Sequence, residues 1–100
     1  MAEFKTDKWG GVRLMVPEKP TVYQIVAFDS KRMELDGLPP MIILWEMAKL
    51  LIQEWESEVM PDFKADLEKL DDPRQARIIE WAGLAVSAYR RNLDAIPKNS

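Results

Sequence analysis

The sequence contains no histidine and no cysteine. Histidine is the commonest general acid or base and the commonest metal ligand in proteins, so its absence excludes Ser-His-Asp and Cys-His catalytic sites. The absence of cysteine excludes disulfide bonds and thiolate metal sites, and it fits a protein of a reducing compartment. Phosphate-binding loops of the GxxxxGK[ST] and GxGxxG types are also missing. We therefore expect no enzymatic activity, no catalytic residues, no bound cofactor and no metal.

No apolar run in the sequence is long enough to cross a membrane. The longest, at 41–52, contains Glu46 and Lys49, and it is shorter than the roughly 20 apolar residues that a membrane-spanning helix needs. The residues at 1–8 lack the apolar stretch of a signal peptide. We therefore expect a cytoplasmic protein that does not enter the membrane.

Acidic residues slightly outnumber basic ones. The chain has 17 Asp and Glu residues against 14 Lys and Arg residues, and its net charge is −3. Proteins that bind nucleic acids normally present a basic surface, so we expect no nucleic-acid partner. The length of 100 residues fits a single domain, 1–100, which buries roughly two-thirds of its unfolded surface.

The stretch 38–60 is the most apolar part of the chain and predicts its central helix. The two prolines that open it suit the first turn of a helix, where their missing N–H groups would have no partner anyway. Over 41–53 the polar residues Glu46, Lys49 and Gln53 form one narrow stripe, and nearly all the others are large and apolar. Such a helix must be covered on several sides. We expect it over 40–59, with the rest of the chain packed around it.

Capping residues predict two further helices. Thr21 and Gln24 fit a capping box, in which the hydroxyl and the amide each bond a free backbone N–H, and it opens a helix over 21–34. Asp72 stands before a proline, which suits an N-cap followed by the first helical position, and it opens a helix over 73–93. Small residues in this last helix allow a close approach to the central helix.

The remaining segments are shorter. Apolar residues at helical spacing predict a short helix over 62–70. Alternating apolar residues predict a strand over 9–16, and the glycine pair within it allows residues 3–5 to pair back as a hairpin. The rest of 1–8 is expected to be loose, and 95–100 to be a polar tail. The expected fold class is mainly α: a small helical domain of three to four helices with a short N-terminal β-strand or hairpin.

Charged residues are clustered in two groups, and each group has two interpretations. The acidic residues at 54–72 include carboxylate pairs of the kind used in glycoside hydrolysis. A solvated helix face together with an N-cap is favoured, because nothing supplies the apolar pocket that raises the pKa of a catalytic carboxyl. Arginines near the last helix would suit an anionic partner, but Arg90 and Arg91 also lie where cations stabilise the helix dipole, and this second interpretation is favoured.

Four tryptophans are many for a chain of this length, and tryptophan is enriched in binding hot spots. Trp45 and Trp81 are expected in the core. Trp9 lies beside two glycines and outside the helical body, so it is the best candidate for a contact with another molecule. The candidate partner-binding residues are Trp9, Val12, Leu14, Trp55 and Tyr89.

The two long predicted helices are apolar around most of their circumference. Their polar stripes are narrower than those of a small helical monomer, and a large exposed apolar patch marks a binding surface. The predicted strand at 12–16 also lacks enough partners. We therefore expect a homo-oligomer or a complex with another protein. The alternative is a monomer in which the first helix and the hairpin cover both sides.

One pattern of residues resembles a known family. A short strand leads into V-P-x-x-P-T-V-x-Q, and helical pieces LWEMAKLLIQEW and DDPRQARIIEWAGLAV follow. The residues that carry the first motif are Val16, Pro17, Pro20, Thr21, Val22 and Gln24. This arrangement, over roughly residues 9–97, resembles the small tail assembly chaperones of long-tailed bacteriophages.

The resemblance implies a non-enzymatic function in the host cytoplasm. Proteins of that family bind the long, helix-rich tape measure protein, keep it soluble and help the tail tube polymerise around it. The expected partners are therefore tape measure and tail tube proteins, and the family is often made with a second, longer product through ribosomal frameshifting. The alternative function is a small cytoplasmic regulatory protein or an enzyme subunit with an acidic site.

Overall fold

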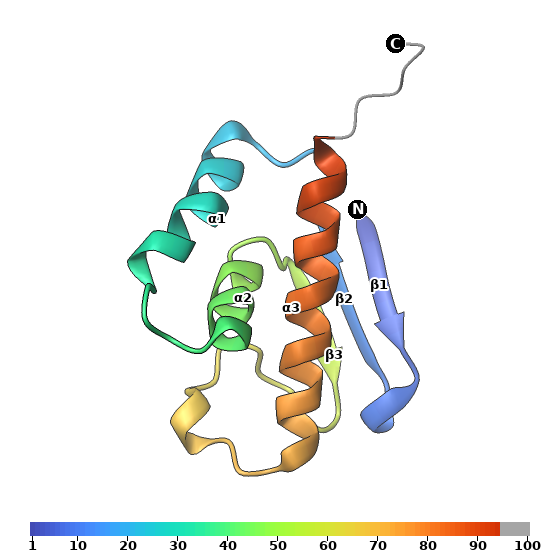
Figure 1. The fold of residues 1–100 in the computed structure, drawn as a ribbon. Helices are drawn as coiled ribbons and strands as arrows, with labels where there is room; N and C mark the ends of the chain where they lie inside the picture. The colour runs from blue at the N-terminus through green and yellow to red at the C-terminus, as the bar shows by residue number, and fades with distance from the viewer. Residues whose placement is uncertain (95–100) are drawn as a thin grey trace.

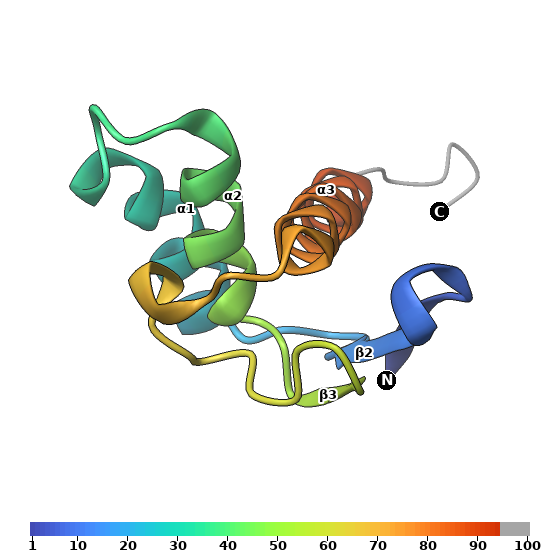
Figure 2. The same ribbon diagram turned by 90° about the horizontal axis from the view of Figure 1, so that it is seen from below.

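The computed structural model describes residues 1–94 and shows three α-helices and a three-stranded antiparallel sheet (Figure 1). The elements in chain order are β1 (Ala2–Thr6), the 3-10 helix η1 (Lys8–Gly10), β2 (Val12–Val16), α1 (Val22–Glu34), α2 (Pro40–Lys49), β3 (Glu54–Ser57), the 3-10 helix η2 (Leu67–Lys69) and α3 (Pro73–Leu93). The helices lie on one side of the sheet (Figure 2). The fold is mixed α/β, so the prediction of a mainly α domain is wrong. The predicted tail at 95–100 lies outside the described residues.

The sheet has the order β1-β2-β3, and β2 is its central strand. Leu14 lies opposite Phe4 of β1 and opposite Trp55 of β3. The side chains of β2 alternate, so that Val12 and Leu14 point into the core while Arg13 lies on the other face. The predicted hairpin is confirmed, but the prediction of a loose segment at 1–8 is wrong, because β1 pairs along its whole length with β2.

The predicted helix over 40–59 is divided into a helix and a strand. α2 ends at Lys49, and the backbone N–H of Gln53 donates to the carbonyl oxygen of Met15 over 2.8 Å, which starts the pairing of β3 with β2. β2 therefore has a neighbour on each side, and the prediction that it lacks partners is also wrong. The predicted helix over 62–70 is wrong as well, because only η2 is helical there.

The predictions from capping residues are confirmed. The side chain of Thr21 accepts a hydrogen bond from the backbone N–H of Gln24 over 3.1 Å, and the Gln24 side chain accepts one in return from the Thr21 backbone over 2.8 Å. Asp72 and Gln75 form the same reciprocal pair at the start of α3. These caps depend on residues three positions apart, so the local sequence is sufficient to specify them.

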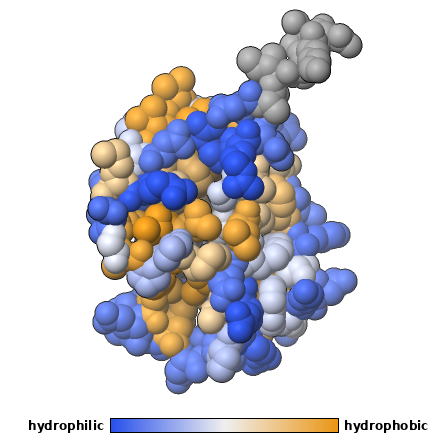
Figure 3. Space-filling model, viewed as in Figure 1, coloured by the Kyte–Doolittle hydropathy of each residue, from blue (hydrophilic) through white to orange (hydrophobic). Residues whose placement is uncertain are grey.

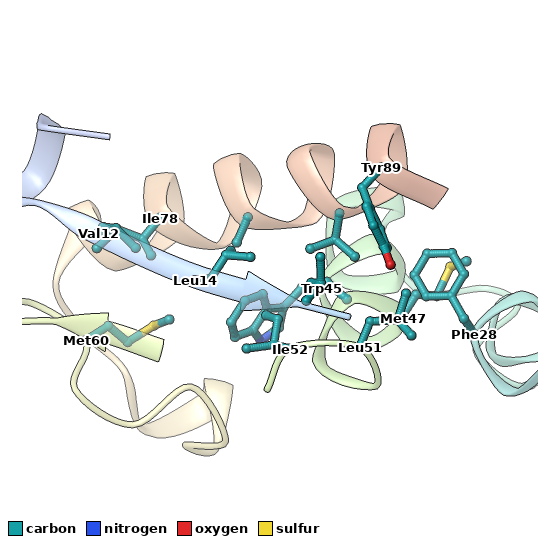
Figure 4. Packing of buried hydrophobic residues seen from close by; sticks show 14 residues of the cluster. Val12, Leu14, Phe28, Trp45, Met47, Leu51, Ile52, Met60, Ile78 and Tyr89 are labelled. Atoms are coloured by element: carbon teal, nitrogen blue, oxygen red, sulfur yellow. The ribbon is translucent and has the colours of Figure 1, made fainter. Parts of the chain in front are cut away.

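The core lies between the sheet and helices α2 and α3. Figure 4 shows Ile78 of α3 close to Val12 of β2 and, further along the strand, Leu14 of β2 and Trp45 of α2; all four side chains are buried. α3 passes close to α2 at Gly83, where an added Cβ atom would lie 3.2 Å from the Cβ of Leu44. The predicted close approach of the two helices is therefore confirmed, and a side chain at position 83 would make its neighbours on α2 shift by a few tenths of an ångström.

α1 is the most peripheral helix. It packs mainly against α2, away from the sheet (Figures 1 and 2). Phe28 is its one buried residue. Two hydrogen bonds from the Arg90 guanidinium to the Asp29 carboxylate, of 3.0 and 2.8 Å, connect α1 to α3, and the Tyr89 hydroxyl donates to the carbonyl oxygen of Pro17 in the segment that precedes α1. α1 is thus held in place by a small number of contacts.

Candidate protein-binding surface

The outer face of α1 carries large apolar side chains that no other part of the described chain covers. Val22 is 76% exposed, Tyr23 81%, Val26 56% and Met33 82%. At about 100° per residue, Val22, Val26 and Met33 lie within roughly 40° of one another around the helix axis. We call these four residues the α1 ridge. Phe28 lies on the opposite side, facing the core, so α1 has two apolar faces and buries only one of them.

A second apolar feature is a groove of about 300 Å³ between the start of α2, η2 and the first half of α3. Its apolar walls are Met41, Ile42, Leu67, Leu70, Ala76 and Ile79. Figure 3 shows hydrophobic surface over several parts of the helical side of the molecule, separated by hydrophilic bands. Grooves and ridges of this kind receive the apolar face of an amphipathic helix in many protein complexes.

The sheet side of the molecule has a different character. An open hollow of about 590 Å³ beside the hairpin turn is lined by charged residues such as Lys5 and Glu56 together with apolar ones such as Val12 and Trp55. On the nearby sheet surface, Arg13 bridges Glu3 over 2.7 Å and Glu56 over 3.2 Å. The hydrogen bond from Arg13 holds the pKa of the Glu3 carboxyl below its usual range. These charged groups stabilise one another across three strands, which suits a solvated sheet face.

The predicted acidic site gains no support from the carboxylates near α3. Hydrogen bonds from the side chain and the backbone N–H of Arg74 lower the pKa of the Asp72 carboxyl, whereas a general acid needs a raised pKa. The favoured interpretation of Asp72, as an N-cap, is confirmed. Within residues 1–94 no group of three potential side-chain ligands lies close enough together to hold a metal ion.

The five predicted partner-binding residues do not form one surface. Val12 is 3% exposed, Leu14 0% and Tyr89 8%. These three side chains point into the core, since Val12 and Leu14 lie on the inner face of β2 and Tyr89 faces Phe4. They are therefore not accessible to a partner in this fold.

The two predicted tryptophans lie at different places. Trp9 is half-buried in the hairpin turn, and its backbone has a φ of 55°, which is uncommon for a residue other than glycine. Trp55 is half-buried between Trp45 and Phe63, with ring centroids 5.6 and 5.8 Å away, and its indole N–H donates to the carbonyl oxygen of Met60 over 2.7 Å. Each retains a partly exposed face; Trp9 packs against the edge of the core, and the hydrogen bond of Trp55 connects β3 to the turn that follows it.

The sequence prediction missed the α1 ridge. The pattern of helix 21–34 gave a usable signal, because Val22, Val26 and Met33 share one side while Phe28 lies on another. A helix with two apolar sides at the edge of a small domain can bury only one of them. The exposed side is therefore the place to look for a binding surface.

Comparison with protein-family models, curated proteins and solved structures found no match. The resemblance to tail assembly chaperones thus remains a prediction from the residues quoted above. No helix in the described part of the chain is both long enough and apolar enough to cross a membrane.

Proposed function

We propose that this protein is a non-enzymatic assembly chaperone whose helical side binds an amphipathic helix of another protein. The observation that carries the proposal is the α1 ridge, on which four large apolar side chains are between 56% and 82% exposed. Apolar surface of this extent on one helix face is unfavourable in water, and a complementary apolar stripe from a partner removes it from water.

The resemblance to tail assembly chaperones indicates that the partner is a tape measure protein. A tape measure protein is long and rich in helices, and its apolar stripes need cover until the tail tube surrounds them. A small chaperone with an exposed ridge on α1 and a groove between α2, η2 and α3 supplies that cover, and it acts in the host cytoplasm without a catalytic step. Under this proposal, the tail tube protein replaces the chaperone as assembly proceeds.

The proposal is tested by changing the ridge without changing the core. The double variant Val26→Glu with Met33→Glu places two carboxylates on the ridge, and both positions are exposed, so the fold is expected to persist. Burial of a Val or Met side chain is worth about 1.5–3 kcal/mol, so the loss of two predicts at least about a tenfold weaker Kd. The measurement is co-purification and calorimetric titration with helical fragments of a tape measure protein.

A matched control is Lys5→Glu, which changes the net charge by the same amount on the sheet side of the molecule. Lys5 is exposed on β1, and the control is expected to bind like the unchanged protein. If the ridge variant keeps full affinity, or if the unchanged protein binds none of the fragments, the proposed function is wrong.

A further inference from the structure

A pocket of about 320 Å³ lies between α1 and the end of α3, with one wall from α2. Phe28 and Met47 supply apolar surface and are each 3% exposed, so they belong to the wall of the core as well. Arg32 from α1 and Arg91 from α3 also line the pocket, and both are exposed. The pocket therefore combines apolar walls with two solvent-accessible guanidinium groups.

A third arginine in the pocket already has partners. Arg90 donates two hydrogen bonds to the Asp29 carboxylate, and its other terminal nitrogen lies 3.1 Å from a carboxylate oxygen of Asp94. These contacts raise the pKa of the Arg90 guanidinium further above its usual value. Arg90 is thus a fixed structural cation, and the two aspartates are directed toward it.

The other two arginines of the pocket, Arg32 and Arg91, have no carboxylate partner among the described residues. Within residues 1–94 neither Arg32 nor Arg91 forms an ion pair, and Arg91 makes only a long hydrogen bond of 3.5 Å to Ser87. The three arginines and two aspartates of the pocket give it a net charge of +1 in a chain of net charge −3. A cation at the end of α3 stabilises the helix dipole, but that role accounts for neither the apolar walls nor the position of Arg32 on a different helix.

We propose that this pocket binds a single carboxylate attached to an apolar group. Guanidinium groups bind carboxylates through paired hydrogen bonds, and the apolar part of the ligand would lie against Phe28 and Met47. A singly charged group fits better than a phosphate, because a second negative charge would face Asp29 and Asp94. At about 30 Å³ per water-sized unit, the volume holds roughly ten non-hydrogen atoms, which is the size of an aromatic or aliphatic acid or of a peptide's last residue.

The inference does not rest on the proposed assembly function, and a small probe tests it on the protein alone. The probe is 3-phenylpropionate, and its neutral amide has the same shape without the charge. Titration into isotope-labelled protein, followed by NMR, should shift the backbone signals of Phe28 and Met47 and the side-chain N–H signals of Arg32 and Arg91. We expect a Kd of about 1 mM for the acid and at least about fivefold weaker binding of the amide.

Two variants test the pocket, and a third is the control. Arg32→Gln and Arg91→Gln each remove one exposed cation, and each should weaken binding of the acid by about fivefold. Arg77→Gln removes an exposed arginine of α3 that pairs with Glu80 outside the pocket, and it should leave the Kd unchanged. The same titration with C-terminal peptide models and with free fatty acid distinguishes a protein terminus from a small-molecule source of the carboxylate.

Four results would overturn the inference. Equal binding of the acid and the amide would show an apolar pocket without charge recognition, and an absence of shifts at Phe28 and Met47 would show no pocket binding. An equal effect of the Arg77 variant would show general attraction to positive charge. Displacement of the acid by inorganic phosphate at equal concentration would show an unselective anion site.

Discussion

Leu50 and Leu51 are neighbours in the turn that follows α2, and they have opposite environments. Leu50 is 42% exposed, whereas Leu51 is fully buried against the core. Their backbone N–H groups bond to the carbonyl oxygens of Met47 and Ala48 over 3.1 and 3.0 Å, so the turn fixes which leucine faces inward. The pair therefore separates the effect of burial from the effect of residue type.

We expect Leu51→Ala and Leu50→Ala to differ strongly in their effect on the free energy of unfolding. Leu51→Ala should lower the free energy of unfolding by about 2–5 kcal/mol, because it leaves a cavity in a close-packed core. Leu50→Ala should change it by about 0.5 kcal/mol or less, as surface substitutions usually do. Urea unfolding followed by tryptophan fluorescence measures both, and similar midpoints for the two variants would contradict the assigned environments.

The elements of this fold differ in how far the local sequence specifies them. The capping box at Thr21 and the N-cap at Asp72 were both predicted correctly, and the structure adds Gln75 as the reciprocal partner of Asp72, three residues away. The strand β3 was not predicted, because Leu51, Ile52 and Trp55 also fit the spacing of a helix. This segment is a strand because it pairs with a distant one: β3 forms its hydrogen bonds with β2, about 40 residues earlier in the chain.

The start of α3 should make the stability of the protein depend on pH through the Asp72 carboxyl. Arg74 lowers the pKa of the Asp72 carboxyl below the ordinary value of 3.8. The charged carboxylate therefore favours the folded state at a pH above 3.8, and this contribution is lost as the pH falls through the lowered pKa. Asp72→Asn keeps a side-chain oxygen at the N-cap but removes the titration.

The expected result is a smaller loss of stability on acidification in Asp72→Asn than in the unchanged protein. Thermal unfolding measured by circular dichroism between about pH 6 and pH 2 provides the comparison. Asp71→Asn is the control, because the neighbouring Asp71 is exposed and accepts no hydrogen bond from another described side chain. If Asp72→Asn and the unchanged protein lose stability equally, Asp72 does not contribute in the way inferred.

The molecule as a whole has one polar side and one partly apolar side. The outer face of the sheet carries ion pairs centred on Arg13, whereas the helical side carries the α1 ridge. The sequence predicted that apolar surface would remain exposed, but it placed that surface on the two long helices and on β2. The third strand was not expected: Trp55 of β3 packs against Trp45 of α2 in the core, and the four most exposed large apolar side chains of the described residues lie on α1.

We expect the protein to self-associate through the α1 ridge. A helix of 13 residues is about 20 Å long, so a ridge-to-ridge contact is smaller than the roughly 800 Å² per partner of a standard stable interface. We therefore expect a weak dimer with a Kd in the micromolar range or above, and a monomer at lower concentration. Sedimentation velocity over a concentration series measures this.

The ridge variant Val26→Glu with Met33→Glu should sediment as a monomer at every concentration, because two carboxylates from each chain would meet at the contact. Lys5→Glu, with the same change of charge on the sheet side, should dimerise like the unchanged protein. A dimer that survives in the ridge variant would place the contact elsewhere on the molecule. If the unchanged protein is a monomer at all concentrations, the ridge does not mediate self-association. The binding experiment with tape measure fragments would then show whether it binds a different protein.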